Sequence, residues 1–91
     1  MTRYTVTYTR NALDALAREW LAASDRRAVT NAGDEIDREL GINAVAKGEE
    51  LREGLRRLTV FPLQAYFTVD EGDRMVHIWS IRIIPDSGGK G

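Results

Sequence analysis

The first third of the chain combines a strand-like alternation with helical spacing. Over residues 4–9 the chain is β-branched or aromatic, with Tyr4, Val6 and Tyr8 on one face, which is typical of a β-strand. Asn11 then offers a helix N-cap, and apolar residues recur at helical spacing from Leu13 to Leu21. We expect a strand followed by a helix whose apolar stripe, Trp20 included, packs into the core.

A second amphipathic helix follows after a few residues. Ser24 or Asp25 is the candidate N-cap, and Gly41 suits the C′ position, where a left-handed residue ends a helix. One apolar stripe runs along this segment: Val29, Ala32, Ile36 and Leu40. The acidic residues between them are expected to be a solvated helix face. Two helices with so short a connection form an antiparallel hairpin.

The second half of the chain is strand-like, after an irregular stretch over residues 41–50. One run covers residues 51–61 and is interrupted by Pro62, a second covers 63–69, and a third covers 74–84. Residues 70–73 form a tight turn in which Gly72 is expected to take positive φ. The predicted fold class is α+β with the order β-α-α-β-β-β, a helical hairpin packed on one face of a small, mainly antiparallel, twisted sheet of four strands.

The last strand suggests that one face of this sheet serves a partner. Under strict alternation one face carries Val76, Ile78, Ser80, Arg82 and Ile84, and the other carries Met75, His77, Trp79, Ile81 and Ile83. Strands that are apolar on both faces are normally covered on both. Two helices cover one face, so the second face is expected to bind a partner. Self-association and cover from residues 41–50 are the alternatives.

Composition narrows the classes of function. The chain has 91 residues, which predicts a single domain over 1–85 with a flexible Gly-rich tail over 86–91. It has no cysteine and one histidine, which argues against disulfides, thiolate chemistry and a metal site. A net charge of −1 disfavours nucleic-acid binding. Without an apolar leader or a membrane-length apolar run, the expected location is the cytoplasm.

Four segments together resemble the RelE/ParE superfamily of bacterial type II toxin–antitoxin toxins, also called plasmid stabilisation proteins. They are residues 4–9, 12–16, 54–60 and 63–69, the last followed by the Asp-rich turn and the final strand. The resemblance spans residues 3–84 and depends on the order and spacing of the segments. It implies that the helical hairpin covers one sheet face, and that the opposite, concave face is where toxin chemistry and much antitoxin contact occur.

This chain has other residues at the positions where the mRNA-cleaving, RelE-like branch has its catalytic residues. That branch uses an arginine near the start of the 63–69 strand, where this chain has Leu63 between Pro62 and Gln64. It also uses arginine, histidine or tyrosine just past the last strand, where this chain has Ile83, Ile84 and Pro85. Cleavage by 2′-hydroxyl attack needs a base, an acid and cations, which aliphatic side chains do not supply. Under strict alternation His77 and Arg82 face opposite ways, so no catalytic residue is expected.

The resemblance therefore favours the ParE-like branch or an uncharacterised one. The ParE-like branch resembles gyrase inhibitors and acts by protein binding. Two alternatives stay open: a ribosome-dependent mRNA endonuclease using Arg57, His77 and Arg82, and a non-toxic module that still binds an antitoxin. Expected partners are a cognate antitoxin and DNA gyrase or the ribosome, with no cofactor and no membrane, and a homodimer is left open.

The residues predicted to bind a partner are basic or aromatic. They are Lys47, Arg52, Arg56, Arg57, Tyr66, His77, Trp79 and Arg82. Only one of Arg56 and Arg57 can face a given surface, because neighbouring strand residues alternate. The alternative for this basic cluster is a solvated face with ion pairs to Glu49, Glu50 or Glu53.

Overall fold

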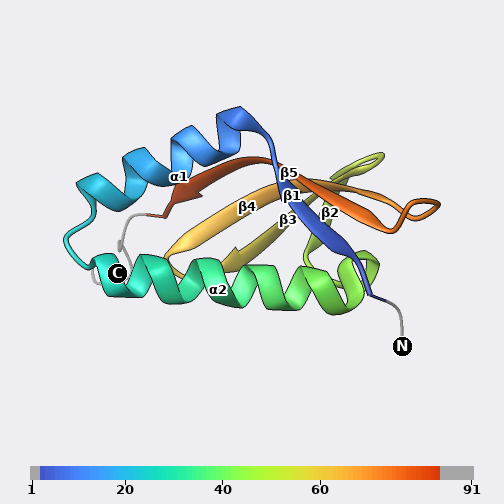
Figure 1. Ribbon diagram of the computed structural model, residues 1–91, viewed down its shortest axis with the longest axis horizontal. Coiled ribbons are helices and arrows are strands. Elements are labelled where there is room, and N and C mark those ends of the chain that lie inside the picture. Colours follow the sequence, from blue (N-terminus) through green and yellow to red (C-terminus); the bar gives the residue numbers. More distant parts are fainter. Residues whose placement is uncertain (1–2, 85–91) are drawn as a thin grey trace.

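The computed structural model describes residues 3–84, in which two helices pack against a five-stranded sheet. The elements are β1 (Thr5–Tyr8), α1 (Arg10–Ala22), α2 (Arg26–Asn43), a short 3₁₀ turn (Ala44–Ala46), β2 (Glu49–Arg52), β3 (Leu55–Val60), β4 (Leu63–Asp70) and β5 (Met75–Ile83). The strand order is β1-β5-β4-β3-β2, with β1 parallel to β5 and every other pair antiparallel (Figure 1). The predicted α+β class is confirmed.

The sheet has one strand more than predicted, because the run over residues 51–61 is not one strand. It contains a tight hairpin in which β2 pairs antiparallel with β3. Gly54 lies in the turn with a φ of 85°, a backbone conformation that favours glycine. The four residues of β2 are all exposed at the sheet edge, so the apolar pattern carried no sign of this strand.

The helix boundaries differ from the predictions at two of four ends. The N-cap of α1 is Thr9 rather than Asn11, since the Thr9 hydroxyl accepts from the amide of Ala12. Asp25 caps α2 as expected, accepting from the amide of Ala28. Gly41 does not end α2, which continues to Asn43. Helix α1 ends at Ala22, close to its expected end.

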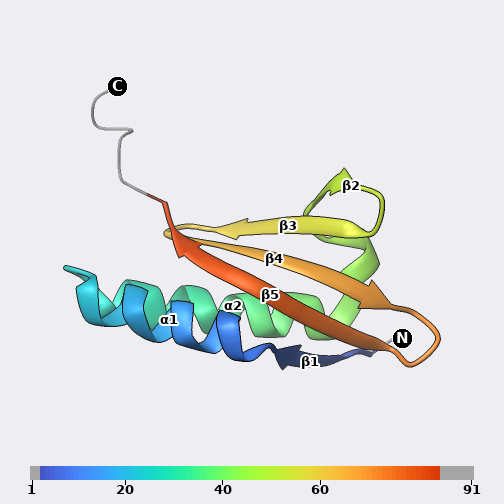
Figure 2. The same ribbon diagram turned by 90° about the horizontal axis from the view of Figure 1, so that it is seen from above.

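The core lies between the helices and one face of the sheet. Figure 2 shows both helices on the same side, and among residues 3–84 no helix covers the other side. The predicted stripe of α2 is buried throughout: Val29, Ala32, Ile36 and Leu40. From the sheet it meets Leu63, Ala65 and Phe67 of β4 and Val76 and Ile78 of β5.

The predicted core stripe of α1 is wrong in part. Leu13, Trp20 and Leu21 are 53%, 39% and 63% exposed, while the buried residues of α1 are Ala12 and Ala15. The small alanines allow α1 to approach β5 closely, and this rotates the larger apolar side chains out of the core. Those side chains instead line a groove between the two helices.

The β4–β5 turn also differs in detail from the prediction. Positive φ in this turn occurs at Arg74, with φ of 54°, and not at Gly72.

No helix among the described residues is long and apolar enough to cross a membrane. The tail predicted for residues 86–91, together with Pro85, lies outside the described residues.

Candidate functional site

A β-bulge in β5 determines which side chains occupy the uncovered face of the sheet. Phe67 pairs with Ile78 and Tyr66 pairs with Ser80, so Trp79 is an extra residue with no partner in β4. The alternation of β5 therefore changes phase at Trp79. Before and after the bulge, apolar residues share the helix-covered face: Val76, Ile78, Ile81 and Ile83. The polar residues His77, Ser80 and Arg82 share the opposite face.

This arrangement corrects two predictions from strict alternation. Ile81 and Ile83 do not lie with His77, and Arg82 does not lie opposite His77. Only Met75 and Trp79 are apolar on the uncovered side of β5, so the argument for a two-sided apolar strand is wrong. An uncovered face does exist among the described residues (Figure 2), and most of its side chains from β3, β4 and β5 are polar.

The start of α1 anchors the bulge. The carbonyl oxygen of Trp79 accepts from Thr9 Oγ1 and from Asn11 Nδ2, each at 3.3 Å. Thr9 also caps α1, so one hydroxyl fixes the helix and the bulge together. A bulge leaves a residue outside the ladder, and these two side chains satisfy its carbonyl.

Hydrogen bonds between polar side chains connect much of the uncovered face, which we call the open face. Its residues come from three strands: Arg57 and Thr59 of β3, Gln64, Tyr66 and Thr68 of β4, and His77, Trp79, Ser80 and Arg82 of β5. Tyr66 donates to Gln64 at 3.3 Å, and Gln64 donates to Thr59 at 3.4 Å.

Two aromatic rings lie together on the β5 side of the open face. Trp79 is 49% exposed, and its indole nitrogen donates to Thr68 Oγ1 at 2.8 Å. The His77 ring lies 6.3 Å from the Trp79 ring, centroid to centroid, and is tilted by 49°. His77 Nδ1 shares a 3.1 Å hydrogen bond with Thr7 Oγ1 on β1. Of the two rings, Trp79 is therefore the better placed to contact a partner.

The predicted basic cluster does not form one surface. Arg57 lies on the open face, where its guanidinium donates to Glu49 at 2.8 Å. The Glu49 carboxylate, and to a smaller extent the Tyr66 hydroxyl, raises the pKa of Arg57. Arg56 points to the other side and donates to the carbonyl of Lys47 at 3.1 Å. This agrees with the prediction that adjacent arginines cannot face the same surface.

Lys47 also lies apart from the open face, whereas the register places Arg52 on the same side of the sheet as Arg57. Lys47 forms a 2.7 Å ion pair with Glu39 of α2, and this contact lowers the pKa of Glu39. Arg52 lies at the end of the edge strand β2, next to Leu55 of β3. Five of the eight predicted binding residues thus lie together on the open face, and Arg52 lies on the same side at the edge of the sheet: Arg57, Tyr66, His77, Trp79 and Arg82 are the five.

Two of the positions at which the sequence resemblance would have placed RelE-type catalytic residues are core positions in this chain. Leu63 is fully buried in the core, and Ile83 packs against it at the end of β5. Within residues 3–84, no group of three or more His, Cys, Asp or Glu side chains is arranged to hold a metal ion. The open face, with its exposed tryptophan and linked polar side chains, is the candidate site.

Sequence reasoning missed five polar residues of this region, namely Thr7, Thr59, Gln64, Thr68 and Ser80. The only signal was a change of phase within 74–84, since Val76 and Ile78 are even-numbered while Ile81 and Ile83 are odd. A change of this kind marks a bulge when one face of a strand is buried.

Comparison with known proteins identifies the fold. No known family profile matches this chain, and no curated protein shows significant sequence similarity. Among solved structures, the RelBE2 toxin–antitoxin complex from Mycobacterium tuberculosis matches with a TM-score of 0.79 and 19% identity, covering 94% of this chain and 97% of that one. The chromosomal ParDE system from P. aeruginosa matches with a TM-score of 0.69 and 19% identity, and the match covers 91% of this chain and 98% of that one. The isolated E. coli RelE toxin matches with a TM-score of 0.55 and 14% identity, and the match covers 96% of this chain and 90% of that one. The chain has the RelE/ParE-like fold that its sequence resemblance implied.

Proposed function

We propose that this chain is the toxin-like component of a toxin–antitoxin module, that it acts by binding a protein target, and that an antitoxin neutralises it by covering the open face. The fold likeness to toxin–antitoxin structures supports the first part. The open face supports the second. It presents a half-exposed tryptophan within a hydrogen-bonded polar surface, and such a combination is typical of a protein-binding hot spot.

The single observation that carries this choice is the spacing of the groups that could act in catalysis. His77 pairs with Thr68 and Arg82 pairs with Gln64, so four positions of β4 separate them. This corresponds to about 13 Å along the sheet. Arg57 is already paired with Glu49. This separation disfavours a base and cations that converge on one phosphate, and it supports the choice of a binding role for the open face.

The experiment is induced expression in a bacterial host, alone and with the protein encoded by the adjacent reading frame. We expect growth arrest with the chain alone, rescue by its neighbour, and inhibition of gyrase supercoiling by the purified chain. Growth without arrest would contradict a toxin. Arrest with unaffected gyrase at high excess would contradict the gyrase version.

Substitution of one tryptophan makes the test specific to the open face. Trp79→Ala should relieve the arrest, because it removes the largest exposed apolar group of that face. Trp20→Ala is the matched control, since Trp20 is 39% exposed, donates its indole N–H to Thr30, and lies in the helical layer. Thermal unfolding would confirm that both variants are folded. Equal loss of arrest in both would contradict a role for the open face.

A second candidate is a ribosome-dependent mRNA endonuclease. The observation in its favour is the bulge, which places Arg57, Tyr66, His77 and Arg82 on one face. Incubation of the purified chain with ribosome-bound message would then yield cleaved message, and His77→Gln would abolish the cleavage. Message that stays intact would exclude this candidate.

A further inference from the structure

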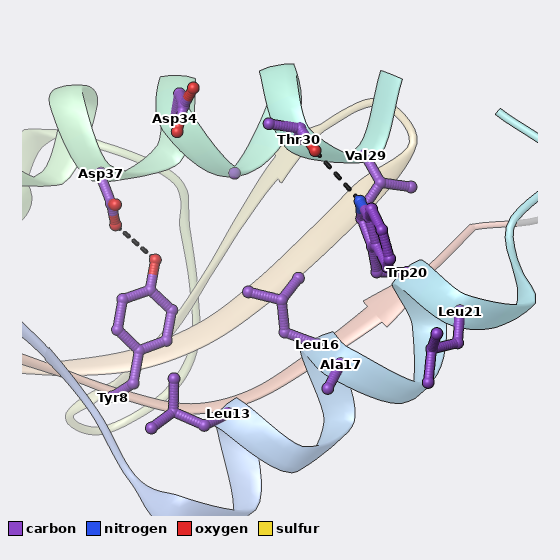
Figure 3. Close-up of a pocket in the computed structure, with 11 residues that line it drawn as sticks. Tyr8, Leu13, Leu16, Ala17, Trp20, Leu21, Val29, Thr30, Asp34 and Asp37 are labelled. Atoms are coloured by element: carbon purple, nitrogen blue, oxygen red, sulfur yellow. Dashed lines mark hydrogen bonds between the residues drawn. The ribbon is translucent and has the colours of Figure 1, made fainter. Parts of the chain in front are cut away.

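An apolar groove of about 510 Å³ separates α1 from α2 (Figure 3). Its α1 wall is formed by Leu13, Leu16, Trp20 and Leu21, and Val29 contributes from α2. Three of these side chains are more than a third exposed, although they are among the largest apolar residues of the helical layer. Exposed apolar side chains gathered along a groove indicate a docking surface.

Acidic side chains line one end of this groove, and an arginine stands beside the tryptophan at its other end. Asp34 and Asp37 line one end, beyond Thr30 on α2 (Figure 3). At the other end the Arg26 guanidinium stands 4.8 Å from the Trp20 ring centroid and donates to the carbonyls of Trp20 and Leu21. Arg26 and Asp34 are eight positions apart on α2, which is about 12 Å along the helix. A complementary occupant would therefore carry an apolar stripe with a positive charge opposite Asp34 and a negative charge opposite Arg26.

We propose that a second copy of this chain occupies the groove. A two-fold axis near Thr30 places the two α2 helices antiparallel, so Arg26 of each copy faces Asp34 of the other. The same operation brings the exposed Trp20 and Leu21 of each copy to the groove of the other, which is the self-complementarity of an isologous dimer. This inference rests on the helical layer alone and does not depend on the proposed function.

The first test measures molar mass by analytical ultracentrifugation over a concentration series. The wild-type chain is expected to convert from monomer to dimer as concentration rises. Leu21→Glu places a charge in the contact and should weaken dimerisation by at least about tenfold. Leu51→Glu is the matched control, because Leu51 is 40% exposed on β2 and does not line the groove; it should leave dimerisation unchanged.

The second test uses charge reversal and mixing. Asp34→Lys alone and Arg26→Glu alone each place like charges together twice in the dimer, so each should weaken dimerisation by about fivefold. In an equimolar mixture, the introduced lysine of one variant meets the introduced glutamate of the other at one contact, and the native Arg26 and Asp34 meet at the other contact. The mixture should therefore dimerise. Asp14→Lys, an exposed residue of α1 outside the groove, is the control for net charge.

The outcomes separate clearly. Recovery of dimer on mixing supports the proposed arrangement, because it requires residue 26 of one copy to face residue 34 of the other. A wild-type chain that stays monomeric, or a dimer that Leu21→Glu leaves intact, overturns the proposal. If the chain is monomeric and the neighbouring gene product binds it but not Leu21→Glu, the groove takes a different protein and the proposal is wrong. Thermal unfolding checks Arg26→Glu, which also loses its bonds to the α1 carbonyls.

Discussion

Tyr8 shows how a single side chain joins the layers of this fold. It lies at the end of β1, and its hydroxyl donates to the Asp37 carboxylate on α2. Burial, followed by the hydrogen bond to Asp37 and the negative charges of Asp37 and Asp34, raises the pKa of Tyr8 well above its usual value. The neutral phenol is therefore favoured more strongly in the folded chain than in the unfolded chain.

This pKa shift predicts a specific loss of stability in alkaline solution. A tyrosine in an unfolded chain ionises at about pH 10, so the stabilisation from the neutral phenol is fully present below that pH and is lost as pH rises above it. Melting temperatures of wild type and Tyr8→Phe, measured from about pH 8 to pH 11, should converge as the wild type loses this advantage. Parallel curves across that range would show that Tyr8 ionises equally easily in both states.

Replacing glycine by alanine should have opposite effects on stability at two positions, one in the loop before β2 and one inside α2. Gly48 precedes β2 with a φ of 74°, and a Cβ there would collide with the backbone carbonyl of Arg57. Gly48→Ala should therefore reduce the free energy of unfolding by about 2–4 kcal/mol. Gly33, inside α2, has nothing within 4 Å of a built Cβ. Gly33→Ala should raise that free energy by about 0.5–1 kcal/mol. Urea titration measures both, and equal effects would contradict the reasoning.

The bulge predicts which deletions the sheet tolerates. Removing Trp79 leaves Ile78, Ser80 and Ile81 opposite the same β4 residues, so both faces of β5 keep their side chains. The variant should stay folded and lose about 1–2 kcal/mol, because the bonds to Thr68, Thr9 and Asn11 disappear.

Removing Tyr66 from β4 is the control, since β4 has no extra residue. The deletion turns either Ala65 or Phe67 away from the core, and the chain should unfold. Circular dichroism distinguishes the two variants. A Trp79 deletion that unfolds as completely as the Tyr66 deletion would contradict the pairing described for β5.

At the scale of the whole molecule, two surfaces of different character lie in different layers. The open face of the sheet is polar with one exposed tryptophan, whereas the groove of the helical layer is apolar with charged ends. The core between them separates the two layers (Figure 2). Because no residue belongs to both surfaces, substitutions on each should act independently.

This separation can be measured in one set of variants. Trp79→Ala is expected to relieve growth arrest and leave the dimerisation constant unchanged. Leu21→Glu is expected to weaken dimerisation by at least about tenfold and leave the arrest unchanged, and the double variant should show both effects. Relief of arrest by Leu21→Glu would mean that dimerisation is required for toxicity, and would contradict the independence of the two surfaces.

The sequence by itself determined the class of fold and most of its core. The stripe of α2 is regular over its full length, so local periodicity assigned its buried face correctly. Asp25 was recognised as a cap because its side chain bonds only three residues ahead. The order of these segments also carried the likeness to the RelE/ParE-like fold.

Only the tertiary structure decided what the surfaces present. The bulge at Trp79 depends on bonds from Thr9 and Asn11, about seventy positions away in the chain, and it alone places His77 and Arg82 on one face. Trp20 and Leu21 fit a helical stripe, but the close approach of α1 to β5 through Ala12 and Ala15 left them outside the core. Periodicity reports which residues share a side of one element, whereas exposure depends on how elements dock against one another.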